Sequence, residues 1–126
     1  MLTTIAKLAR MGNEIIIVNC EEGVLSGSRE NVLKETLQVF HRGTPEWGPY
    51  PPVRPDRVVR RMVRNMVDYK SVHGNKDYKR IKTFIGVPEE YAKEISKEYK
   101  FKKSGDLVHN RYVKLGDMCR QIGAKW

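Results

Sequence analysis

The chain has few of the residues that build metal centres, disulfide frameworks or membrane spans. Its three histidines and its two cysteines, Cys20 and Cys119, show no metal-ligand spacing and no CxxC pair. Two distant cysteines of this kind are typical of reduced thiols in a cytosolic protein. No apolar run approaches the roughly 20 residues of a transmembrane helix, and polar or basic residues interrupt the N-terminal stretch. The sequence predicts a single globular domain over residues 1–126, with no metal site and no membrane partner.

Motifs of nucleotide and nucleophile sites are also scarce. Neither GxGxxG nor GxxxxGK[ST] occurs, although the predicted turn at 23–28 precedes a helix whose N-terminus suits a phosphate. An acidic pair follows the first predicted strand, where α/β enzymes place functional groups. Cys20 and either His41 or His73 are candidates for a nucleophile–base pair. However, Cys20 lies at the end of a strand that is predicted to be buried. A small nucleotide-binding enzyme stays open as an alternative, with no catalytic residue and no cofactor predicted.

Positive charge, in contrast, is abundant and concentrated. The net charge is +9, of which residues 54–82 carry +7, while residues 1–53 come to −1 and residues 83–126 to +3. Charge scattered over a surface needs no explanation beyond solubility. Charge gathered in less than a quarter of the chain favours a polyanionic partner.

Residues 56–69 predict a helix that displays much of this charge on one side. Apolar pairs recur every four residues, and Pro55 suits the first turn. At roughly 100° per residue, four arginines fall within an arc of about 100° nearly opposite the apolar stripe. They are Arg57, Arg60, Arg61 and Arg64. A mixed-charge face would be read as solvated, but here only Asp68 breaks the single sign. Because the planar fork of arginine donates two parallel hydrogen bonds, we expect this face to bind a phosphate backbone.

Further basic residues extend this predicted surface beyond the helix. They are Arg54, His73, Lys76, Lys79, Arg80 and Lys82. In a strand, Arg80 and Lys82 would share one face and Ile81 would take the other. Basic residues at 100–103 begin a tail at 100–126, in which Lys102, Lys103, Arg111 and Lys114 are better read as solvated.

The rest of the chain alternates between predicted helices and strands. We predict helices at 2–11, at 29–42 with Ser28 as N-cap, from Pro88 onward and at 116–122. Strands are predicted at 14–20 and 81–87. A turn is predicted at 23–27 and a polar loop around His73 and Gly74. This alternation predicts an α/β fold with a parallel sheet whose strands are buried on both faces. Two strands are too few to cover these helices, so part of the sheet is missing or the chain relies on a partner.

The prolines are confined almost entirely to one segment. Residues 43–55 contain five of the six and predict an extended loop. Within it, Trp47 and Tyr50 either stack on unpaired bases or pack back on the domain, and the sequence leaves both open. The helix before this loop has a predicted core stripe of Leu33, Leu37 and Phe40.

Five segments together resemble the ribosomal protein L-thirteen family of the large subunit, in its archaeal form. They read IIIVNCEEGVLSG, HRGTP, RPDRVVRRMVRNMV, IKTFIGVPEE and YVKLGDMCRQIGAKW, and they follow in order over nearly the whole chain. The resemblance implies a three-layer α/β/α domain around a small, mainly parallel sheet of four strands. It also implies a non-enzymatic, cytoplasmic protein of the ribosome. Its partners would be large-subunit ribosomal RNA and neighbouring large-subunit proteins, without a small-molecule substrate.

Carried over by position, the resemblance also implies which residues bind RNA. They are His41, Arg42 and Gly43, then Arg54, Arg57, Arg60, Arg61 and Arg64, with Lys70 and His73 in the basic loop that follows. Relatives carry a first strand and a Gly-Arg pair ahead of the opening helix, so we expect one sheet strand to be missing here, through truncation or a start site assigned too late. Asn65 stands where relatives usually have Gly, so RNA is expected to approach less closely there. A regulatory RNA binder acting away from the ribosome remains an alternative.

Overall fold

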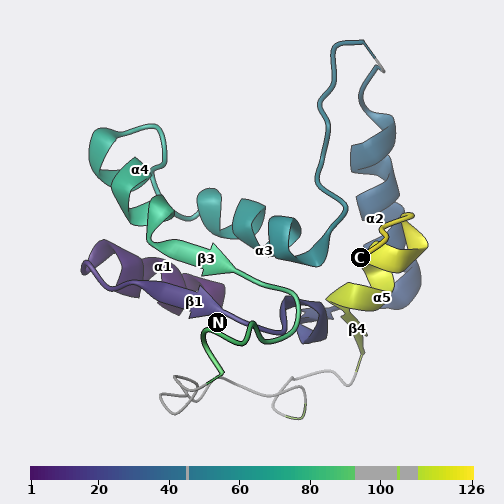
Figure 1. Cartoon of the computed structure of the whole chain (residues 1–126). Helices are drawn as coiled ribbons and strands as arrows, with labels where there is room; N and C mark the ends of the chain where they lie inside the picture. The colour runs from purple at the N-terminus through teal and green to yellow at the C-terminus, as the bar shows by residue number, and fades with distance from the viewer. Residues whose placement is uncertain (45, 93–104, 106–110) are drawn as a thin grey trace.

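The computed structural model describes residues 1–44, 46–92, 105 and 111–126. Within these residues, five α-helices, one short 3-10 helix and four short strands follow one another (Figure 1). In chain order they are α1 (Leu2–Arg10), β1 (Ile15–Ile17), η1 (Cys20–Glu22), β2 (Val24–Ser26), α2 (Arg29–His41), α3 (Pro55–Arg64), α4 (Val72–Lys79), β3 (Ile81–Thr83), β4 (Tyr112–Lys114) and α5 (Leu115–Gln121). The α/β fold class is confirmed. No helix in this part of the chain is long and apolar enough to cross a membrane.

The described strands form two separate pairs. β1 and β3 run parallel, with Ile15 opposite Ile81, as the two predicted strands suggested. The isoleucines of β1 are only half-buried, so the prediction of a strand enclosed on both faces is wrong for β1. β2 and β4 run antiparallel, with Leu25 opposite Val113. The predicted turn at 23–27 is therefore wrong, because its backbone pairs with a strand that lies almost ninety residues later in the chain.

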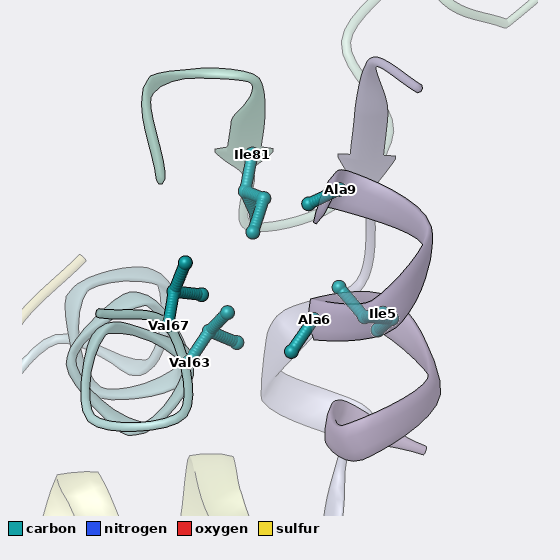
Figure 2. Packing of buried hydrophobic residues seen from close by; sticks show 6 residues of the cluster. All are labelled: Ile5, Ala6, Ala9, Val63, Val67 and Ile81. Carbon is teal, nitrogen blue, oxygen red and sulfur yellow. The ribbon is translucent and has the colours of Figure 1, made fainter. Parts of the chain in front are cut away.

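The parallel pair packs on the main hydrophobic cluster (Figure 2). This cluster consists of Ile5, Ala6 and Ala9 of α1, Val63 of α3, Val67 just beyond α3, and Ile81 of β3. In Figure 2, α1 and α3 lie beside each other and their side chains converge below β3. Val63 and Ile81 are completely buried. Of the apolar stripe predicted for residues 56–69, Val59, Val63 and Val67 are buried as expected, whereas Met66 is exposed.

A second cluster lies at the other end of α3. It joins Cys20, Val59, Val113, Leu115, Met118 and Cys119. Val59 and Val63 are one helical turn apart on α3 and belong to different clusters. Helix α3 therefore spans both clusters and is fixed from the same side at two points.

Helix α2 is correctly predicted in extent but not in packing. Ser28 caps it, because its Oγ accepts the N–H of Asn31 at 3.4 Å. No residue of α2 is buried, and Leu37 is 39% exposed. Of the predicted core stripe only Leu33 packs against the second cluster. Together with the loop that follows, α2 forms an arm that projects from the rest of the molecule (Figure 1).

The polar loop predicted around residue 73 is wrong, because helix α4 occupies it. The Oγ of Ser71 accepts the N–H of Gly74 at 3.0 Å and caps this helix. A side chain at Gly74 would collide with the carbonyl oxygen of Asp68, so α4 needs glycine there to pack against the preceding turn. Glycine and asparagine are poor helix formers, which is why their presence misled the prediction.

The remaining predicted helices are matched closely where the structure describes them. Helices α1 and α5 agree with the predicted 2–11 and 116–122 to within one residue. Helix α3 ends at Arg64, five residues earlier than expected, and turns follow it. After Pro88 the chain makes a turn through residue 92, and the rest of the helix predicted there lies outside the described residues, as do residues 100–103.

We expect Val63→Ala to lower the free energy of unfolding by roughly 2–3 kcal/mol, because it removes buried methyl groups and leaves a cavity. The matched change Val72→Ala, at a helical valine that is 73% exposed, is expected to stay within about 0.5 kcal/mol of the parent. Urea denaturation followed by circular dichroism measures both. Equal effects would show that α3 is not held through Val63.

Candidate nucleic-acid interface

Helix α3 presents one face of arginines, because its other face is committed to the core. Pro55 occupies the first turn and Arg54 precedes it with extended backbone. Val59 and Val63 are buried, which fixes the rotation of the helix about its axis. The side chains on the opposite side form the arginine face, Arg57, Arg60, Arg61 and Arg64. Within the described residues, none of these four guanidinium groups takes part in an ion pair.

The arginine face lines an open concavity with a volume of about 360 Å³. All four arginines contribute to its lining, together with Tyr50 and Pro52 of the proline loop and Tyr78 of α4. Three segments that are separate in the sequence thus meet around one group of positive charges. A concave wall of low dielectric concentrates the field of such charges and favours an anionic ligand.

Two of the four guanidinium groups are stacked on tyrosine rings. The guanidinium carbon of Arg60 lies 5.0 Å from the centre of the Tyr78 ring, and that of Arg64 lies 4.7 Å from the centre of the Tyr69 ring. Both distances fall within the range of a cation–π interaction. Tyr69 and Tyr78 were not predicted as site residues, because helical phase identifies neighbours on one helix and not partners from a later turn or helix.

The same two arginines carry buried donors without acceptors. The Nε atoms of Arg60 and Arg64 are shielded from solvent and have no hydrogen-bond partner in the described part of the chain. An unsatisfied buried donor costs on the order of 1–3 kcal/mol. Because a site closed to water is also closed to a phosphate oxygen, an anion in the concavity would contact the terminal Nη groups of these arginines and not their Nε atoms.

The other predicted binding residues do not line this concavity, and they differ in exposure and pairing. Lys70, His73, Lys76, Lys79 and Lys82 are exposed on the turn after α3, on α4 and on β3. Arg80 caps α4 instead of lying in a strand, so its predicted alternation with Lys82 is wrong, although Ile81 is buried as expected. The Arg80 guanidinium contacts Asp77 at 2.8 Å, and Arg54 lies 3.5 Å from Asp56, so these two charges are partly compensated.

The segment His41–Arg42–Gly43 is not brought to the concavity. It lies where α2 ends, at the far end of the arm (Figure 1). Gly43 approaches the backbone of Gly48 closely, since a Cβ there would lie 3.0 Å from its carbonyl group. In the same loop Trp47 is 88% exposed, which rules out that it packs back on the domain, whereas Tyr50 is 70% exposed and lines the concavity.

Asn65 ends α3 as an exposed C-cap residue with ordinary helical backbone angles. The position therefore does not demand the conformational freedom of glycine. If relatives have glycine here, as the resemblance implies, Asn65 adds a side chain at the end of α3 without changing the path of the chain.

The alternatives with catalytic chemistry find no support in the described residues. Burial raises the pKa of both the Cys20 and the Cys119 thiol to about 11, which suppresses the reactive thiolate. The backbone of the proposed phosphate turn at 23–28 is used in the pairing of β2 with β4. The carboxylate of Glu21 accepts the N–H of Gly86 at 3.1 Å and so joins η1 to the loop after β3. No group of side chains in the described parts could hold a metal ion.

Comparison with known proteins identifies similar sequences over the whole chain. The family model described as ribosomal protein L13 matches residues 3–90, a span that includes α3 and α4. The chain is 37% identical to the large ribosomal subunit protein uL13 of Methanococcoides burtonii, over all of this chain and 91% of that protein. It is also 37% identical to the protein of that name from Methanosarcina barkeri, with the same coverage. Identity to the corresponding Methanopyrus kandleri protein is 32%, over 98% of this chain and 79% of that one.

We expect both thiols to react slowly with thiol reagents in the folded protein. A pKa of about 11 instead of 9.0 lowers the thiolate fraction near neutral pH by about 100-fold, and burial slows access further. Reaction with a chromogenic disulfide at pH 8 should therefore be slow for the native protein and rapid in guanidinium chloride. Rapid reaction of one thiol before unfolding would contradict its burial.

Proposed function

The chain belongs to the ribosomal protein L13 family, and on that premise we propose that it is a structural component of the large ribosomal subunit, bound to large-subunit ribosomal RNA through the arginine face of α3. The family is one of structural proteins and not of enzymes. Its named relatives are proteins of the large ribosomal subunit, and they match this chain from end to end. We accordingly place the protein in the ribosome of the cytoplasm, beside neighbouring large-subunit proteins.

The observation that carries the RNA-binding proposal is the state of the four arginines. They share one side of α3, they line one concavity, and no acidic side chain in the described residues neutralises them. A phosphate backbone supplies a row of negative charges and acceptor oxygens that suits such a surface. Each phosphate that is neutralised releases condensed counterions, which makes affinity large and dependent on salt.

Recognition by this surface would depend on backbone position and shape. Phosphate contacts fix the orientation of a protein on a nucleic acid but carry no base sequence. Structured RNA offers irregular backbone paths that a concave, positively charged surface can match. Around the central arginines, we propose supporting contacts from the exposed basic residues of α4 and its flanks, Lys70, His73, Lys76, Lys79 and Lys82. Arg54 and Arg80 would contribute less, because each lies beside an aspartate.

The arm would provide a second and separate contact. His41, Arg42 and Gly43 lie at the end of α2, away from the concavity, so the RNA they touch is not the segment held by the arginine face. The exposed Trp47 ring beside them is available to stack on an unpaired base. The proposed interface therefore has two parts, which suits a protein that spans neighbouring segments of folded RNA.

Replacing Arg60 and Arg61 together by alanine should flatten the salt dependence of RNA binding. Loss of two phosphate contacts is expected to reduce the slope of log K against log salt concentration by about 1.4 to 1.8. Filter binding to large-subunit ribosomal RNA over a range of salt concentrations gives this slope.

The matched control for this experiment is Lys7→Ala with Arg10→Ala. It removes the same charge from exposed positions on α1 and should leave the slope nearly unchanged. If the control flattens the slope as much as the α3 variant, binding reflects net charge and not the arginine face.

Cosedimentation with large ribosomal subunits tests the cellular role. We expect the wild-type protein to sediment with the subunits and the Arg60→Ala, Arg61→Ala variant to be released at lower salt. A protein that binds free RNA but never enters the subunit would favour the regulatory alternative.

A further inference from the structure

We propose that Tyr78 and Tyr69 are positioning residues that hold the guanidinium groups of Arg60 and Arg64 as two preformed phosphate ligands. This inference rests on the proposed function and goes further, because it divides the arginine face into two ordered and two mobile arginines. It assigns roles to two uncharged side chains that come from outside α3. The ligand is the phosphodiester backbone of RNA.

The contact with a tyrosine ring occupies none of the hydrogen-bond donors of either arginine. A cation–π interaction is an attraction between the cation and the ring, and it requires no N–H donor of the guanidinium group. An aspartate or glutamate in the same place would hold the side chain equally well but would occupy the donors and cancel the charge. Tyrosine therefore orders Arg60 and Arg64 while keeping them available for phosphate.

The buried Nε atoms indicate which edge of each guanidinium group is turned away from a ligand, which leaves the terminal Nη groups to contact phosphate. Bidentate recognition of phosphate uses two parallel N–H groups of one guanidinium. In both stacked arginines the Nε is shielded from water and lacks an acceptor within the described residues, and both side chains line the same concavity. The two guanidinium groups lie one helical turn apart on α3, so their terminal Nη groups can each contact a phosphate along one RNA strand.

Arg57 and Arg61 provide the internal comparison. They line the same concavity, yet neither is stacked on an aromatic ring of the described residues. Binding must immobilise these two side chains, whereas Arg60 and Arg64 have already lost part of their freedom on folding. Arg60 and Arg64 should therefore contribute more to the affinity for RNA than Arg57 and Arg61, although all four carry the same charge.

The support for the stacked pair comes from the packing after α3. Tyr69 lies in the turn that follows the helix, and Tyr78 lies on α4, which reaches its place through the close approach at Gly74. Both rings are half-buried, so their positions are set by the fold and not by the ligand. The stacked arrangement exists before RNA arrives.

Paired substitutions at Tyr78 and Tyr69 test the proposal. Tyr→Leu at either position removes the aromatic ring and is expected to weaken RNA binding by about 3- to 30-fold, the range of a cation–π contact, with an unchanged salt slope. Tyr→Phe keeps the ring and should bind within about twofold of wild type. Thermal unfolding of each variant confirms that the protein is folded at the temperature of the assay. Leucine variants that bind like wild type, or phenylalanine variants as weak as the leucine ones, would overturn the proposal.

A double-mutant cycle separates positioning from a general packing role. In an Arg60→Ala background, Tyr78→Leu should have almost no further effect on affinity, because the side chain it positions is gone. An undiminished effect there would mean that Tyr78 acts through the fold alone, and the proposal fails. As a second readout, Arg60→Lys keeps the charge but loses the planar fork, so it should weaken binding while the salt slope stays near that of wild type.

The outcomes also separate this inference from the proposed function. If removing Arg60 and Arg61 leaves the salt slope unchanged, the arginine face does not bind RNA, and both proposals fall. If that variant behaves as expected while the tyrosine variants bind normally, only the positioning role is overturned.

Discussion

The rotation of α3 about its own axis is the constraint on which the rest of the structure depends. Val59 packs into one hydrophobic cluster and Val63 into the other, so the helix is fixed from one side at two points. Burial of valine side chains thus decides where the charged side chains lie. A helix held at a single point could turn in response to charge repulsion among its arginines. With two points of attachment it cannot, and the positive charges remain gathered.

In the described structure, no acidic side chain neutralises the four arginines of the arginine face. Its three ion pairs lie elsewhere, between residues near one another in sequence. The contacts made by Arg60 and Arg64 are to tyrosine rings, which lower the freedom of a cation without cancelling it. Within the described residues, none of the four guanidinium groups of the arginine face has an acidic partner. Arginine side chains that are ordered by tyrosine rings but not neutralised by acidic groups are what a surface that binds an anionic partner requires.

Periodicity in the sequence predicted α3 and the arginine face well, because both follow from spacing along a single helix. The parallel pairing of β1 with β3 followed from two β-branched runs separated by a helical pattern. The errors arose where tertiary contacts overrode local preference. Residues 23–27 were predicted to form a turn, but most of them form a strand because they pair with a distant one. Gly74 was predicted to lie in a loop, but it is part of a helix that packs closely against the preceding turn. The periodicity of a single helix could not predict the contacts of Tyr69 and Tyr78 with the arginines. These contacts depend on how α4 and the turn before it pack against α3.

The pairing of β2 with β4 has a consequence for the order in which the molecule is completed during translation. Among the described residues, the cluster that contains Val63 and Ile81 draws on none beyond β3, so this part of it can close before the C-terminal residues are available. The cluster around Val59 draws Val113, Leu115, Met118 and Cys119 from the last fifteen residues of the chain. Helix α3 is consequently anchored at its C-terminal half first and at its N-terminal half only when the nascent chain is nearly finished. A chain that ended before Val113 would keep its arginines yet hold them on a helix that has lost most of its second cluster.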